Sequence, residues 1–128
     1  MENGLKEINL AACAHLGDAV YELFIREKIV KLTSKPQKMH KMTTELVCAA
    51  AQASFLNELE NFFTDEEKDI LRRARNLPLT QNKKNNQSIH RQATAFEVII
   101  GYFYLTNQPR LQQFFDEIAQ IALFQSLG

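Results

Sequence analysis

Residues 95–104 read AFEVIIGYFY, and this apolar run, interrupted by one acid, decides where the core of the fold lies. It belongs to a helix predicted over about 89–105. Its strongly apolar part, residues 98–105, is far shorter than the roughly 20 residues that a membrane span requires. The run therefore predicts a core helix and gives no sign of a membrane partner.

Hydrophobic side chains also recur at three- and four-residue spacing in the segments before this run, as they do in amphipathic helices. One such helix is predicted across about 16–32. After a break at residues 34–36, an apolar stripe predicts one long helix that ends only at residues 61–63. Its alanine-rich stretch, residues 49–53, has strong intrinsic helix propensity.

Turn and capping signals define the remaining elements. Thr64 and Glu67 form the pattern of a capping box, so a short helix should begin there and run into residues 72–76. Residues 77–88 are the one clear loop, and Asn107 with Pro109 predicts a turn into a last helix. Because there is no repeat and no convincing strand, the sequence predicts an all-α helical bundle in a single domain over residues 1–128.

The composition excludes several classes of protein. A chain of 128 residues suits one domain, and 45% hydrophobic with 23% charged residues argues against intrinsic disorder and fibrous structure. Residues 1–8 lack the apolar stretch of a secretory signal. Cys13 and Cys48 are too few for a disulfide framework, so we expect two reduced core thiols in a soluble, cytoplasmic protein.

The charges are segregated, although 15 basic and 15 acidic residues give no net charge. Residues 28–44 hold five lysines and no acid, and residues 70–96 hold six basic residues and no acid. A local basic surface can bind phosphate whatever the net charge of the chain. Nucleic acid is therefore a candidate partner of this formally neutral chain.

Two acids stand where simple packing would not place them, Asp18 at the start of an apolar helix and Glu97 within the core run. A buried carboxylate is costly unless it is paired, hydrogen-bonded or bound to a metal. Asp18 could cap its helix after Gly17, and Glu97 could form a buried salt bridge with Arg91 or another base. The functional alternative is that both acids bind Mg²⁺, which takes carboxylate oxygens together with water and substrate phosphate.

Two further features have a structural and a functional interpretation. Glu22 lies four residues after Asp18 and could share its helix face, but it could also be a solvated surface acid. The sequence RRARN at 72–76 could be only the basic end of a helix, where it would complement the helix dipole. The three histidines lack zinc-type spacing, and the four glycines do not form a phosphate-binding loop.

The residues around both acids resemble the ribonuclease III catalytic domain, in particular its Mini-III branch, which lacks a domain for binding double-stranded RNA. The resemblance lies in LGDAVYE at 16–22 and TAFEVIIGY at 94–102. Residues 35–41, 49–52 and LRRARN at 71–76 also match the family in order and spacing. The match covers about residues 8–120, which is nearly the whole chain.

The resemblance implies an all-α endonuclease that forms a homodimer and hydrolyses double-stranded RNA with Mg²⁺, for which Mn²⁺ could substitute. Asp18 and Glu97 match catalytic, metal-binding acids of the family, and Glu22 would be an acid beside them. Full-length ribonuclease III has two further acids, where this chain has Ala14 and Thr94. Mini-III proteins also lack these two acids. Few metal ligands therefore remain, which puts a two-metal site in doubt.

The resemblance further implies a substrate, the precursor of large-subunit (23S) ribosomal RNA, with a ribosomal protein as a candidate auxiliary factor. We expect the loop 77–88 and its flanks to contact RNA, with the lysines of residues 28–41 as weaker candidates. The rival interpretations are a non-catalytic helical RNA-binding protein and a helical scaffold whose basic stretches are only solvated faces. The predicted RNA-binding residues are Arg72, Arg73, Arg75, Asn76, Lys83, Lys84, Asn85 and Arg91.

Overall fold

The computed structural model describes residues 9–79 and 86–127, and these residues form helices, turns and short connections without a strand. This confirms the all-α prediction. Among the described residues, no helix is both long and apolar enough to cross a membrane. The elements are α2 (Leu10–Ile29), α3 (Pro36–Val47), α4 (Ala49–Glu58), the 3₁₀ turn η1 (Glu60–Phe62), α5 (Asp65–Arg75), α6 (Gln87–Thr106) and α7 (Gln108–Leu127).

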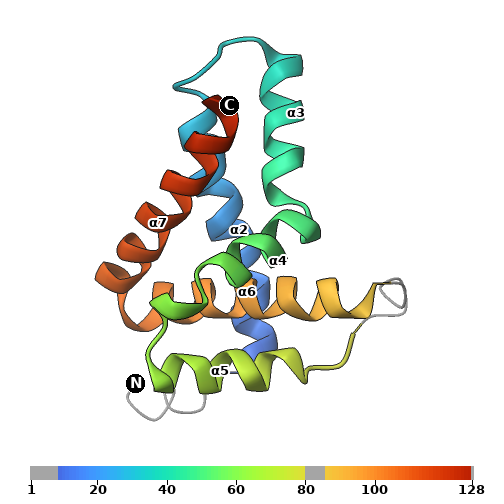
Figure 1. Ribbon diagram of the computed structural model, residues 1–128, viewed down its shortest axis with the longest axis vertical. Coiled ribbons are helices and arrows are strands. Elements are labelled where there is room, and N and C mark those ends of the chain that lie inside the picture. The colour runs from blue at the N-terminus through green and yellow to red at the C-terminus, as the bar shows by residue number, and fades with distance from the viewer. Residues whose placement is uncertain (1–8, 80–85, 128) are drawn as a thin grey trace.

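Helix α6 is the central element of the fold. Figure 1 shows it crossing the middle of the molecule, with α5 along one side and α4 on the other. It packs most extensively on α2 and then on α4 and α5. Val98, Ile99 and Ile100 are all fully buried, which confirms that the apolar run forms the core. Aromatic side chains extend this core, with the rings of Tyr21 and Phe96 edge to face at 4.8 Å.

Helix α2 begins earlier than the hydrophobic spacing predicted. Asn9 caps it, since its side-chain oxygen accepts a hydrogen bond from the Ala12 amide at 3.1 Å. Asp18 therefore lies well inside the helix, and the interpretation of Asp18 as the cap is wrong. The spacing missed the first turn because a side-chain cap can start a helix before its apolar stripe begins.

The long helix predicted after Pro36 is in fact two helices, with a break at Cys48, whose φ of −67° and ψ of 160° are extended. Two side-chain donors replace helical bonds at this point. The Tyr21 hydroxyl donates to the Leu46 carbonyl at 2.7 Å, and the Gln52 side chain donates to the Val47 carbonyl at 3.1 Å. Burial raises the pKa of Tyr21, so its hydroxyl stays protonated and can donate.

The break leaves α3 at the edge of the molecule, and it contributes no fully buried residue. Cys48 is exposed at the break, whereas Cys13 is buried in α2. The expectation of two core thiols is therefore correct for Cys13 and wrong for Cys48. Helical propensity alone could not reveal the break, because one of the two donors, Tyr21, comes from another helix.

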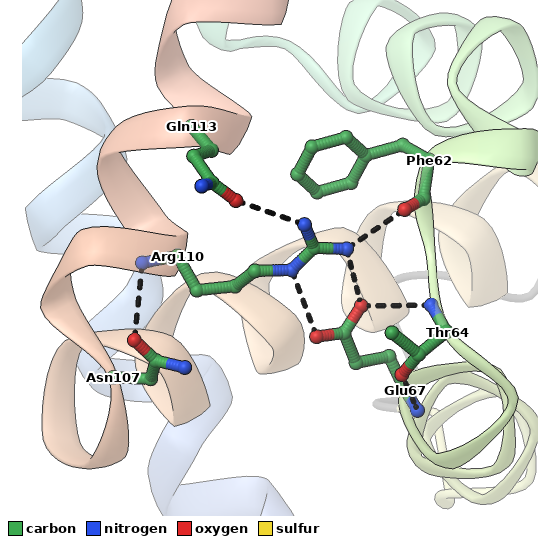
Figure 2. A network of polar contacts seen from close by, with 6 residues as sticks. All are labelled: Phe62, Thr64, Glu67, Asn107, Arg110 and Gln113. Atoms are coloured by element: carbon green, nitrogen blue, oxygen red, sulfur yellow. Dashed lines mark hydrogen bonds and ion pairs between the residues drawn. The ribbon is translucent and has the colours of Figure 1, made fainter.

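The predicted capping box at the start of α5 is confirmed, and Arg110 of α7 completes it (Figure 2). The Thr64 amide donates to Glu67 at 2.9 Å, and the Glu67 amide donates to the Thr64 hydroxyl at 3.2 Å. Arg110 then donates two hydrogen bonds to the Glu67 carboxylate, at 2.9 and 2.8 Å. Its guanidinium also bonds the Phe62 carbonyl at 2.7 Å and lies 3.9 Å from the centre of the Phe62 ring.

This network joins the start of α7 to η1 and to the first turn of α5. Burial by itself would raise the pKa of Glu67, but hydrogen bonds from Arg110 and Thr64 outweigh it, so the pKa lies below its ordinary value. A carboxyl group with a depressed pKa in the folded state stabilises the fold above its unfolded pKa. That stabilisation disappears as the pH falls through the folded pKa.

We expect Glu67→Gln to lower the free energy of unfolding by about 1–3 kcal/mol at neutral pH, because it removes charge-assisted hydrogen bonds. The difference from the unmodified chain should shrink as the pH falls from the ordinary pKa of a glutamate through the lowered pKa of folded Glu67. Urea denaturation between pH 3 and 7 measures this. Glu66→Gln, at an exposed position of the same turn, is the control. An equal loss in both variants would contradict the assignment.

Candidate active site

The site is organised by two glycines at the crossing of α2 and α6. A Cβ atom added to Gly17 would overlap the carbonyl oxygen of Glu97 and lie 2.8 Å from its carbonyl carbon. A Cβ atom added to Gly101 would meet Cys13 in the same way, 2.8 Å from its carbonyl carbon. The two helix backbones are therefore in direct contact, which only residues without a side chain allow.

This contact brings the two predicted catalytic acids to one place. Gly17 lies against the main chain of Glu97, and Asp18 is the next residue along α2. Asp18 is exposed and Glu97 is half-buried, so the acids lie where the helix crossing reaches the surface. Asp18 and Glu97 are 79 residues apart in the sequence. The helices that carry them pack so closely that a methyl group does not fit between their backbones.

The two acids suit a hard divalent cation. Carboxylate oxygens are the ligands that Mg²⁺ prefers, and it is commonly held by one or two carboxylates while water and substrate phosphate fill the other positions. Within residues 9–79 and 86–127, no group of three or more His, Cys, Asp or Glu side chains is arranged to hold a metal. A site on Asp18 and Glu97 would therefore need water and phosphate to complete the coordination of the cation.

Glu22 lies one turn after Asp18 on α2 and takes part in an ion pair with Arg26 at 2.7 Å. The side chains of both residues are well exposed, at 40% and 64%. The structure therefore supports the interpretation of Glu22 as a surface acid. Its role beside a metal stays a prediction.

The basic end of α5 is less positive than its sequence suggests. Arg72 and Arg73 both form ion pairs with Asp69, at 2.7 and 3.3 Å. The hydrogen bond from Arg72 is the main cause that holds the pKa of Asp69 below its ordinary value. Asn76 is the exposed C-cap of the helix. Arg72, Arg73 and Arg75 occupy its last turn, where cations complement the helix dipole.

A polar network joins this end of α5 to α6 and α4. Arg91 donates to the carbonyl oxygens of Arg75 and Leu77, at 2.8 and 3.4 Å. Arg75 donates to the side chain of Gln92 at 2.6 Å, and Gln92 donates to Asn57 at 3.0 Å. The sequence carried no signal for Gln92 or Asn57, because lone amides have no characteristic spacing.

The predicted RNA-binding residues thus fall into two groups. Arg72, Arg73, Arg75, Asn76 and Arg91 gather where α5 ends and α6 begins. Lys83, Lys84 and Asn85 belong to residues 80–85, which lie outside the described residues. Contact of either group with RNA stays a prediction.

Comparison with known proteins gives a consistent family. The family model for the ribonuclease III domain matches residues 11–108. Mini-ribonuclease 3 of Staphylococcus aureus is 39% identical over 125 residues, which cover 94% of this chain and 93% of that protein. Mini-ribonuclease 3 of Thermosynechococcus vestitus is 40% identical over 109 residues, which cover 85% of this chain and 72% of that protein.

A solved structure extends the likeness to the fold. The crystal structure of protein FN1578 from Fusobacterium nucleatum superposes with a TM-score of 0.80 at 25% sequence identity. The superposition covers 91% of this chain and 96% of that one. The helical arrangement around α6 is therefore shared with an experimentally determined structure.

We expect Gly17→Ala to destabilise the fold by about 1–3 kcal/mol, because the added methyl group must push α2 away from α6. Any gain of helix propensity, about 1 kcal/mol, would oppose this and fall short of it. Urea denaturation gives the difference. The control is Ala19→Gly, at an exposed position of the same helix, where only the propensity is lost. A stabilised Gly17→Ala variant would show that the backbones are not in contact.

Arg91→Ala should lower the free energy of unfolding by about 1–2 kcal/mol, because two carbonyl groups at the end of α5 lose their donor. Arg91→Lys keeps the charge but lacks the planar guanidinium group. Its free energy of unfolding should lie between those of the unmodified chain and Arg91→Ala. Chemical denaturation of the three proteins measures this order. Unchanged stability of Arg91→Ala would mean that Arg91 does not anchor α5.

Proposed function

Since this chain belongs to the ribonuclease III family, and within it to the Mini-ribonuclease 3 branch of endoribonucleases, we propose that it hydrolyses phosphodiester bonds of double-stranded RNA with Mg²⁺. The observation that supports the proposal is the contact of Gly17, the residue before Asp18, with the main chain of Glu97. We further propose that Mn²⁺ can replace Mg²⁺.

In the proposed mechanism, Asp18 and Glu97 hold the cation through their carboxylate oxygens. Mg²⁺ bound there would supply positive charge to the scissile phosphate and lower the pKa of a water molecule. The close α2–α6 crossing would limit movement of the main chain that carries the two carboxylates, so little backbone reorganisation would be needed when substrate binds. Because Asp18 is exposed and Glu97 only half-buried, a bulky duplex can reach both.

Ala14 and Thr94 explain why the ligand set is small. Ala14 lies one turn before Asp18 on α2, and Thr94 lies three residues before Glu97 on α6. Neither side chain can contribute a carboxylate, so the substrate phosphate and water would complete the coordination. We propose one metal per site on these grounds.

RNA would be held beside the acids by the end of α5 and the start of α6. Helix α6 carries Glu97, and one to two turns earlier it carries Arg91 and Gln92, which fix the end of α5. The arginines are therefore held at a set position relative to the candidate metal ligand. A-form RNA is bound mainly through phosphates and 2′-hydroxyls across its minor groove, which such a surface suits.

We propose that the active form is a homodimer, since two identical sites related by a two-fold axis suit the two strands of a duplex. We also propose that the substrate is the precursor of 23S ribosomal RNA in the cytoplasm, with a ribosomal protein as auxiliary factor. These assignments rest on membership of the Mini-ribonuclease 3 branch, whose relatives match most of this chain.

The direct test is cleavage of a long RNA duplex with and without Mg²⁺, with single-stranded RNA and duplex DNA as substrate controls. Loss of an acid that only supports a metal ligand costs about 10–100-fold, so Asp18→Asn and Glu97→Gln should each cost at least about a hundredfold. Both variants should still bind the duplex. Asp116→Asn, which removes an exposed acid of α7, should cleave normally. Full activity of Asp18→Asn would overturn the proposal.

A further inference from the structure

The strongest unpaired positive charge among the described residues lies at the corner between α2 and α3. Lys28, Lys31, Lys35, Lys38 and Lys41 are all exposed. Within the part of the chain that the structure describes, the acid-bound cations are Arg26, Arg72, Arg73 and Arg110, and none of these five lysines is among them. We call these five lysines the corner lysines.

The basic residues at the end of α5 differ from the corner lysines in how far their charges are already used by internal partners. Arg72 and Arg73 share Asp69, and Arg91 donates to two backbone carbonyls, so part of their capacity to bind phosphate is already used. The corner lysines have no acid between residues 28 and 44 to compete with. Lys28 has an aromatic partner, since its ammonium lies 5.7 Å from the centre of the Phe24 ring. A phosphate that approaches this corner therefore need not displace an acid, whereas one that approaches Arg72 must compete with Asp69.

The arrangement of α3 presents three of these charges together. Met39, Met42 and Leu46 are partly buried against the core and define the inner side of α3. Lys38 and Lys41 are three residues apart on one side of α3, and Lys35 is the N-cap residue just before the helix. The next acid is Glu45, one turn after Lys41, and it marks the end of the basic stretch.

We propose that the corner lysines form a second contact surface for the phosphate backbone of duplex RNA, away from the catalytic acids. This inference rests on the proposed function. Lysine ammonium groups are hydrated point charges that attract phosphate without fixed geometry, so the contact would be independent of base sequence. Lys28 follows Asp18 by ten residues, which is about 15 Å along α2. The surface therefore strengthens binding of a duplex without touching the reacting phosphate.

The position of the surface has a consequence for substrate length. A duplex that spans both the acids and the corner gains both contacts, whereas a duplex too short to reach the corner gains only the first. The corner lysines should therefore favour long duplexes through KM and leave kcat unchanged. Phosphate contacts also release counterions, so each one steepens the dependence of affinity on salt.

The test uses the full chain with Lys35→Gln, Lys38→Gln and Lys41→Gln combined, and a labelled RNA duplex of about three helical turns without divalent cation. Each lost phosphate contact should lower the slope of log affinity against log salt by about 0.9, so the triple variant should lose about 2–3. In a separate cleavage assay with Mg²⁺, KM for this duplex should rise at least about tenfold at low salt while kcat stays constant. Circular dichroism and thermal unfolding verify that the variant is folded.

A matched pair of single substitutions separates a local contact from a change in net charge. Lys38→Gln should lower the salt slope by about one, and Lys68→Gln, at an exposed position among the acids of α5, should leave it unchanged. An unchanged salt slope in the triple variant would overturn the proposal. It would favour an acidic protein over RNA as the partner of the corner lysines. If the triple variant binds normally and the unmodified chain cleaves duplex RNA, only this inference fails. If the unmodified chain does not cleave duplex RNA, the proposed function fails.

Discussion

The structure depends on the backbone contact between α2 and α6. Gly17 and Gly101 face the main chain of Glu97 and of Cys13, so the helices meet with no side chain between them. Close-packed interiors transmit small displacements instead of absorbing them. The same backbone contact therefore determines both the packing of the core and the relative position of the main chain at Asp18 and Glu97. Stability and chemistry cannot be varied independently at these positions.

The polar contacts of the fold hold the remaining helices around this crossing. Arg110 joins α7 to η1 and α5, while Arg91 and Gln92 join the other end of α5 to α6. Helix α5 is therefore held at both ends by side chains of other helices. The arginines of α5 form contacts within the fold and are therefore only partly available to a ligand. A cluster of basic residues in the sequence thus does not imply an equal amount of unpaired positive charge on the surface.

Sequence patterns predicted those parts of the fold that depend on local chemistry. The capping box at Thr64 and Glu67 and the core run around Ile99 both follow from spacing along one helix. The break at Cys48 could not be predicted, because it depends on Tyr21 of another helix. The acids of the candidate site were found by their unusual setting and by resemblance, but their approach depends on two glycines that no periodicity identifies. The partners of the basic residues likewise could be identified only from the fold.

The peripheral position of α3 has an evolutionary consequence. This helix contributes no fully buried side chain, and the Tyr21 hydroxyl fixes its end through a main-chain carbonyl, which every amino acid possesses. Substitutions on its outer side therefore leave both the core and this tether intact. Surface changes of this kind usually alter stability by less than about 0.5 kcal/mol. The charge that α3 presents can thus change with little effect on stability, so selection on that charge would act through ligand binding and not through folding.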